Sequence, residues 1–280
     1  MVNTDRISPV GAPHSSIQPK PSPATFRQGW QWLAHAADYI AKRPLVYIPA
    51  VVWLLLLSSL QWFVPGAGAF FSGFLAPLSI APLLVTFASH YRAEQALSWR
   101  TGFSVFRREP LLRLLRLGFY FMLVVLLLSQ LSGWIMAQVL PEQLLNMLAQ
   151  QDLKYLIYAP KHYLMLILAL TALPMATLGF LAWYSIPLVL FQQARIPQVL
   201  WTSIKACLRN YWALMAVSLL LIVVVIGAAI ILFFVTALGS AISPALGYLI
   251  DLFIIMIGSA FLQTALVGAQ YLSYMRYVQR

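Results

Sequence analysis

The sequence predicts an all-α integral membrane protein with six transmembrane helices, arranged as three helical hairpins that are each preceded by an amphipathic cytoplasmic surface helix. Of the 280 residues, 61% are hydrophobic and only 9% are charged, whereas soluble domains carry about 25% charged residues. Apolar runs of about 18 residues or more recur along the chain, as in membrane-spanning helices. These runs do not alternate at every second residue, which favours helices over the strands of a membrane barrel.

Residues 1–25 differ from the rest of the chain and are expected to be a disordered cytoplasmic tail. They contain five prolines together with Ser, Gly and Ala, and such a composition has too little apolar surface to drive folding. No apolar run follows Arg6, so the segment lacks the pattern of a secretory signal peptide. The tail either tethers a partner or is inert, and residues 26–280 form the transmembrane domain.

Six segments are long enough to cross a hydrocarbon layer of ~30 Å at a rise of about 1.5 Å per residue. The longer ones predict tilt or an extension into the interface. The connections at 65–69 and 239–243 carry no charge, which predicts tight external turns and makes hairpins of spans one and two and of spans five and six. The expected spans are 45–64, 70–90, 111–135, 162–191, 211–238 and 244–275.

The Lys and Arg residues near the helix ends predict the orientation, because cytoplasmic loops carry an excess of both. The side that holds both termini collects fourteen of them, whereas the opposite side has only Lys154 and Lys161. We therefore expect both termini in the cytoplasm. The fourteen are Arg27, Lys42, Arg43, Arg92, Arg100, Arg107, Arg108, Arg113, Arg116, Arg195, Lys205, Arg209, Arg276 and Arg280.

Three cytoplasmic segments, before spans one, three and five, have helical periodicity. Their apolar residues share one face, which predicts helices that lie in the membrane interface with rings and aliphatic chains down and charges up. Pro44 and Pro110 end the first two where the chain turns into the bilayer. The faces are Trp30, Leu33, Ala37 and Ile40; then Trp99, Gly102, Phe103 and Phe106; then Leu200, Ile204, Cys207 and Leu208.

A repeat supports this arrangement: GFLAPLSIAPLLV at 73–85 returns as GFLAWYSIPLVL at 179–190. Both copies lie in helices that run from outside to inside, so the repeat is parallel. Gly73 and Gly179 are expected to permit close approach of a neighbouring backbone. In the third return helix a stripe of small residues, Ala260, Thr264 and Gly268, takes that role.

Pro82 and Pro187 close the two copies of the repeat and are expected to kink their helices past mid-membrane. A proline has no N–H, so each kink frees backbone carbonyls. We expect these carbonyls to be satisfied by neighbouring helices or by Ser79 and Ser185.

Three segments carry a resemblance: GWQWLAHAADYIAKRPL, FSVFRREPLL and PQVLWTSIKACLRN. They resemble a family of mainly proteobacterial multi-pass inner-membrane proteins without an assigned activity, over about residues 26–280. A looser similarity runs to the membrane portions attached to some glycerophosphodiester phosphodiesterases, whose enzymatic domain this sequence lacks. The resemblance implies a helical bundle in the bacterial inner membrane and no site residues.

A basic cluster at the start of the third span is the first candidate site. It consists of Arg100, Arg107, Arg108, Arg113 and Arg116. Anionic lipid headgroups attract such a patch by ~1 kcal/mol per Lys or Arg. The cluster either binds phospholipid or phosphate specifically or acts as a topology anchor with general lipid attraction, and nucleic acid is not an expected partner.

Asp251 is the one acidic residue within an expected span and is the second candidate. Intramembrane carboxylates are costly and often functional, as proton or cation sites. Counting twenty residues back from Arg276 reaches Met256. This count favours the alternative, in which Asp251 is an interfacial residue at the outer headgroups, bonded to water or to a neighbouring hydroxyl.

The external connection at 136–161 predicts a surface-lying amphipathic helix. Pro141 and Glu142 suit a first helical turn, and one stripe collects Leu140, Leu144 and Leu148. This helix either packs on lipid or docks a membrane protein partner.

No pattern indicates chemistry. His14, His35, His90 and His162 are scattered without ligand spacing, and Cys207 is the single cysteine. We expect no catalytic, cofactor-binding or metal-ligating residues. The leading hypothesis is a non-enzymatic membrane protein that acts as scaffold, assembly factor or lipid-associated accessory. The alternative is a permease or channel, because repeats and broken helices often frame transport sites.

Overall fold

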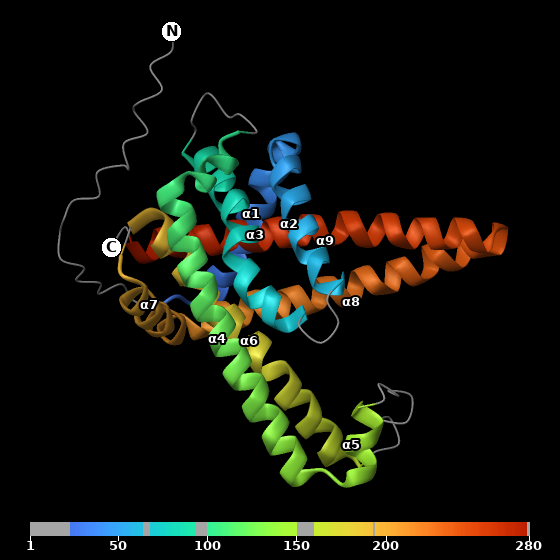
Figure 1. Cartoon of the computed structure of the whole chain (residues 1–280). Helices are drawn as coiled ribbons and strands as arrows, with labels where there is room; N and C mark the ends of the chain where they lie inside the picture. Colours follow the sequence, from blue (N-terminus) through green and yellow to red (C-terminus); the bar gives the residue numbers. More distant parts are fainter. Residues whose placement is uncertain (1–22, 64–67, 93–99, 150–159, 193, 279–280) are drawn as a thin grey trace.

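The computed structural model describes residues 23–63, 68–92, 100–149, 160–192 and 194–278. Within these residues the chain is all-α (Figure 1). The elements are α1 (Phe26–Lys42), the 3-10 helix η1 (Pro44–Val46), α2 (Ile48–Phe63), α3 (Gly68–Tyr91), the 3-10 helix η2 (Gly102–Phe106), α4 (Arg108–Val139), α5 (Glu142–Ala149), α6 (Lys161–Gln192), α7 (Ile196–Arg209), α8 (Tyr211–Ile242) and α9 (Pro244–Val278).

Five helices in the described part of the chain are long and apolar enough to cross a membrane, and the chain is therefore a membrane protein. The expected count of six spans is not confirmed. Its first span corresponds to α2, which has 16 residues and an apolar stretch of only Ile48–Leu57. The helix starts late because residues 44–46 form η1. The five are Gly73–Tyr91, Arg108–Val139, Lys161–Gln192, Tyr211–Ala241 and Ile254–Val278.

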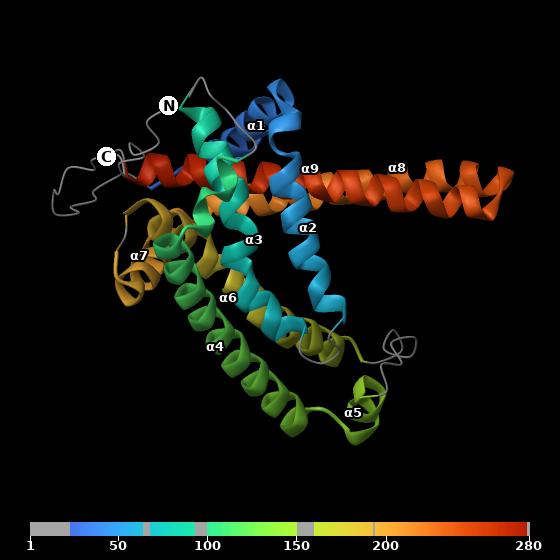
Figure 2. The same cartoon turned by 45° about the horizontal axis from the view of Figure 1, so that its top comes forward.

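The long helices pack as neighbours along the chain. α2 packs on α3, α3 on α4, α4 on α6, and α8 on α9. Figures 1 and 2 show α8 and α9 leaving the rest of the molecule together as one long hairpin, while α4 and α6 extend in a different direction with α5 at their far end. Two apolar arms thus project from a common body.

The packed core occupies the common body, where the basic ends of the helices meet. Most of the buried side chains of α3, α6 and α9 come from their C-terminal halves, as in Phe87, Tyr184 and Tyr271. The arms are largely uncovered: on α8, Phe233 is 71% exposed and Leu238 is 72% exposed. Apolar side chains can remain uncovered in this way when lipid surrounds them, because lipid tails are as apolar as the side chains themselves.

Two of the three expected surface helices are present, as α1 and α7, but both are part of the core. α1 packs against α8 and α9, and its buried face includes Trp32 and Ala36, whereas the expected Trp30 is 52% exposed. A Cβ atom at Gly29 would overlap the carbonyl oxygen of Ala213 on α8. α7 lies on α6 and buries Ser203 and Cys207, while the expected Leu208 is exposed.

The third expected surface helix is not an α-helix in the described residues 100–106. That segment is the short 3-10 helix η2, which packs on α3, and Trp99 lies outside the described residues. The rings of Phe103 and Phe106 stand edge-on to Trp53 of α2, at centroid distances of 6.2 and 5.0 Å. These rings therefore cover a neighbouring helix.

In the part of the external connection that the structure describes, up to Ala149, the chain forms one helix, α5, of eight residues. Leu140 and Leu144 are buried against Ile167 of α6, with Met147 and Leu148 packed beside them. The predicted apolar stripe is present and covers the ends of α4 and α6; residues 150–159 lie outside the described part of the chain. The tail likewise falls on residues 1–22 outside it, although Ala24 is buried in the core.

Candidate functional site

The first expected kink is at Pro82, inside α3, which leaves the carbonyl of Leu78 without its usual helical donor. The indole Nε1 of Trp53, on α2, donates a hydrogen bond to this oxygen at 3.0 Å. Thr86 Oγ1 donates to the carbonyl of Pro82 at 2.8 Å. The kink is thus bonded both from a neighbouring helix and from its own next turn.

The second kink, at Pro187 in α6, has the same chemistry with different residues. Pro187 frees the carbonyl of Trp183, four residues earlier. The amide Nε2 of Gln270, on α9, donates to this oxygen at 2.8 Å and to the carbonyl of Ala182 at 3.0 Å. Gln270 is buried, so both bonds form away from solvent.

The hydrogen bonds at Pro82 and Pro187 confirm the expectation that neighbouring helices satisfy the freed carbonyls. The serines of the repeat bond other carbonyls: Ser79 donates to Ala76 and Ser185 to Leu181. Gly73 lies against Met122 and Val125 of α4, as expected. The same expectation for Gly179 is wrong, because nothing lies within 4 Å of where its Cβ would stand.

α7 is bonded to the second kink. Ser203 Oγ donates to the carbonyl of Leu181 at 2.8 Å, and Cys207 Sγ donates to that of Phe180 at 3.1 Å. Burial raises the pKa of the Cys207 thiol to about 12, which keeps it protonated as a donor. One turn later, Asn210 donates to Tyr184 and accepts from the backbone N–H of Ala24.

The basic cluster lies at the start of α4. Arg107 precedes the helix, and Arg107, Arg108 and Arg116 are exposed. Arg113 is half-buried and pairs with Glu109 at 3.7 Å, one turn earlier. Arg100 is exposed in the segment before η2. The start of α4 therefore carries basic side chains over its first three turns, and the carboxylate of Glu109 offsets one of their positive charges.

The exposed face of α4 changes character along its length. After the arginines come Phe119 and Tyr120, which are 49% and 41% exposed, then aliphatic side chains, and finally Trp134, which is 63% exposed. From Tyr120 to Trp134 is fourteen residues, about 21 Å at the helical rise. A basic end, aromatic residues at both ends and an aliphatic stretch between them match the layers of a bilayer.

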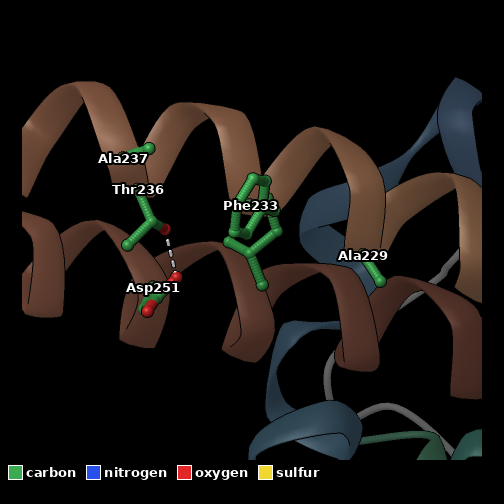
Figure 3. Close-up of a pocket in the computed structure, with 6 residues that line it drawn as sticks. Ala229, Phe233, Thr236, Ala237 and Asp251 are labelled. Atoms are coloured by element: carbon green, nitrogen blue, oxygen red, sulfur yellow. Dashed lines mark hydrogen bonds between the residues drawn. The ribbon is translucent and has the colours of Figure 1, made fainter.

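Asp251 lies on α9 and accepts a hydrogen bond from Thr236 Oγ1 on α8. The two side chains close one end of a groove of about 350 Å³ on the α8–α9 arm, which is lined by Ala229, Leu232, Phe233, Thr236, Ala237 and Asp251 (Figure 3). Asp251 and Thr236 are its polar members. The groove is thus an apolar surface with one carboxylate at its edge.

The histidines considered as possible metal ligands lie in separate parts of the structure. His90 and Tyr47 are hydrogen-bonded, at 2.7 Å between Nδ1 and the hydroxyl, and the ring of His162 lies tilted beside that of Tyr163, with the ring centroids 4.1 Å apart. In the described ranges no group of three or more His, Cys, Asp or Glu side chains is placed to hold a metal ion. His14 lies outside these ranges.

Two roles were missed at the sequence level. Trp53 and Trp183 are both partly buried hydrogen-bond donors, Trp53 to the carbonyl of Leu78 and Trp183 to Ser273 Oγ at 2.9 Å. Pro82, on the neighbouring helix, indicates that a carbonyl there needs a hydrogen-bond donor. Sequence alone does not show that Trp53 is this donor, because the two residues lie on different helices.

No protein-family model, curated protein or solved structure matches the chain.

Proposed function

We propose that the chain is a non-enzymatic, multi-pass protein of the bacterial inner membrane, with both termini in the cytoplasm, that acts as a lipid-associated scaffold or assembly factor. The resemblance of the segments at residues 29–45, 103–112 and 197–210 supports the family and the compartment. The observation that carries the proposal is the use of the polar side chains in the core, which hold helices together.

The donors at the two kinks illustrate this use. Trp53 and Gln270 each bond a carbonyl that a proline has freed. Ser203 and Asn210 bond α7 to α6 and to the start of α1. A scaffold needs such internally satisfied polar groups, because an unpaired polar group in the membrane costs free energy.

A permease makes a different demand on the same residues. Broken helices that frame a transport site turn their freed carbonyls toward a substrate or an ion. Here Trp53 and Gln270 occupy these carbonyls from neighbouring helices. The kinks therefore favour the scaffold over a permease.

The scaffold is tested by solute flux across liposomes that contain the purified full-length chain. We expect no flux of ions, amino acids or sugars above that of protein-free liposomes. As a control, Gln270→Leu leaves the Trp183 carbonyl without its side-chain donor, and this variant should also show no flux. Saturable transport of a defined solute by the wild-type chain would contradict the proposal and favour the permease.

The lipid association is tested at the basic cluster with the variant Arg107→Gln, Arg108→Gln, Arg116→Gln. Each exposed arginine contributes ~1 kcal/mol of attraction to anionic lipid. The variant should therefore retain at least about tenfold less phosphatidylglycerol, relative to phosphatidylcholine, when lipids bound to the purified protein are measured by native mass spectrometry. Lys161→Gln is the control, because Lys161 begins α6 on the proposed external side, away from the arginine cluster. This variant should leave the ratio unchanged.

A further inference from the structure

The apolar lining of the groove on the α8–α9 arm comes from one face of α8. Ala229, Leu232, Phe233, Thr236 and Ala237 follow one another at intervals of three and four residues, which places them on one face of α8. Figure 3 shows Ala229 at one end of this face and Thr236 at the other, where α9 contributes Asp251. The polar end of the groove points toward the tip of the hairpin, because residues 236 and 251 flank the turn at residue 243.

The helical rise gives the depth of this polar end. Asp251 lies 25 residues before Arg276, and Thr236 lies 27 residues after Arg209. At about 1.5 Å per residue these separations are about 38 and 40 Å. A bilayer with its headgroups measures ~40–45 Å. When the arm stands upright in the bilayer with Arg209 and Arg276 at the inner headgroups, Asp251 lies at the outer headgroups and Ala229 lies about 10 Å deeper, among the acyl chains.

The carboxylate at this depth has capacity left for a ligand. Thr236 donates to one of its oxygens, Oδ1, and an ionised carboxylate accepts about four hydrogen bonds. Among the described residues no ion pair of Asp251 is seen. A cationic hydrogen-bond donor at the headgroups would complete the site.

We propose that this groove binds a phospholipid of the outer leaflet whose headgroup carries a primary ammonium, as phosphatidylethanolamine does. The ammonium group donates charge-assisted hydrogen bonds to Asp251, and an acyl chain lies along Phe233, Leu232 and Ala229 toward the membrane centre. A choline headgroup has no N–H and forms no such bond. The site goes beyond the proposed scaffold role and lies at the opposite membrane surface from the arginine cluster.

A lipid fits this face better than a second transmembrane helix. Close packing between membrane helices needs small residues that let the two backbones approach. Here Phe233 and the adjacent Phe234 are 71% and 62% exposed, and their rings would hold a second backbone away. A flexible acyl chain can instead lie beside the rings.

The test compares phosphatidylethanolamine and phosphatidylcholine with identical acyl chains, mixed equally in nanodiscs that contain the full-length chain. Native mass spectrometry after release should show the ethanolamine lipid retained at least about threefold above the choline lipid, a ratio equivalent to ~0.65 kcal/mol. Asp251→Asn, which keeps the shape and removes the charge, should bring the ratio to one. Ser259→Ala, two turns further along α9, is the matched control and should retain the preference.

The proposal is overturned if the wild-type chain shows no headgroup preference, or if Asp251→Asn keeps it. Should Asp251→Asn not fold, Thr236→Val tests the same oxygen, since loss of the hydroxyl frees the carboxylate to move and should lower the ratio. A photo-crosslinking residue at position 233 supplies an independent readout in cells. An adduct with the mass of the ethanolamine lipid supports the proposal, whereas an adduct with a polypeptide overturns it in favour of a protein partner.

Discussion

At the scale of single residues, the polar side chains of the core act as donors to carbonyls that the helices cannot satisfy themselves. Trp53 and Gln270 have no chemistry in common beyond an N–H group, yet each bonds the residue four before a proline. The sequence could predict the kinks at Pro82 and Pro187, because the missing N–H is a local property. It could not predict the donors, because these come from α2 and α9 through the tertiary fold.

Replacement of Gln270 by leucine tests this role. Gln270→Leu removes both bonds to α6 and leaves the Trp183 carbonyl buried without its side-chain donor, so the free energy of unfolding should fall by about 1–3 kcal/mol. The measurement is unfolding of the purified chain in mild detergent with a denaturing detergent. Gln263→Leu, on the partly exposed side of the same helix, is the control and should change stability by less than about 0.5 kcal/mol. Equal effects of the two substitutions would refute the role.

Cys207 provides a pH-dependent test of the contact between α7 and α6. Burial raises its folded-state pKa from an ordinary value of 9.0 to about 12, so the stability that the protonated thiol contributes is complete below pH ~9 and is lost as the pH rises toward 12. We expect the free energy of unfolding to fall over this range and to fall less steeply in Cys207→Ala. Parallel pH curves for the two proteins would show that the thiol contributes nothing.

At the scale of the elements, periodicity predicted that α1 and α7 exist but not where they lie. An apolar face is equally suited to a membrane interface and to a protein core, and the pattern does not distinguish them. The deciding features are small residues at crossing points: Gly29 against Ala213, and Gly268 against Ala36 and Phe87. Such complementarity needs two helices at once, so a single stretch of sequence does not reveal it.

Two glycines make a matched test of helix crossings. A Cβ at Gly118 would overlap the carbonyl oxygen of Phe74 on α3, whereas a Cβ at Gly179 meets nothing within 4 Å. Gly118→Ala should therefore cost about 1–3 kcal/mol of unfolding free energy. Gly179→Ala should be neutral or stabilising by up to ~1 kcal/mol, because alanine is the better helix former. The reverse order in detergent unfolding would mean that α3 and α4 do not cross at Gly118.

At the scale of the whole molecule, the core gathers at the basic ends of the helices and two apolar arms extend from it (Figure 1). Composition and charge alone predicted a helical membrane protein with cationic ends, because these properties depend on transfer of whole segments from water to lipid. The count of six spans was not confirmed, since α2 has only 16 residues. The different directions of the two arms follow from packing, which segment hydropathy does not describe.

The most direct test of the account asks on which side of the inner membrane two positions lie in intact bacterial cells. One is the tip of the α8–α9 hairpin, and the other is the segment that precedes α4. Ser240→Cys, near the tip of the hairpin, and Ser104→Cys, in η2 beside the arginine cluster, are exposed to a membrane-impermeant thiol reagent; the buried native Cys207 serves as the internal reference. We predict labelling of position 240 in intact cells and of position 104 only after the inner membrane is permeabilised. Labelling of position 104 in intact cells, or equal labelling of positions 104 and 240 before permeabilisation, would contradict the proposed orientation.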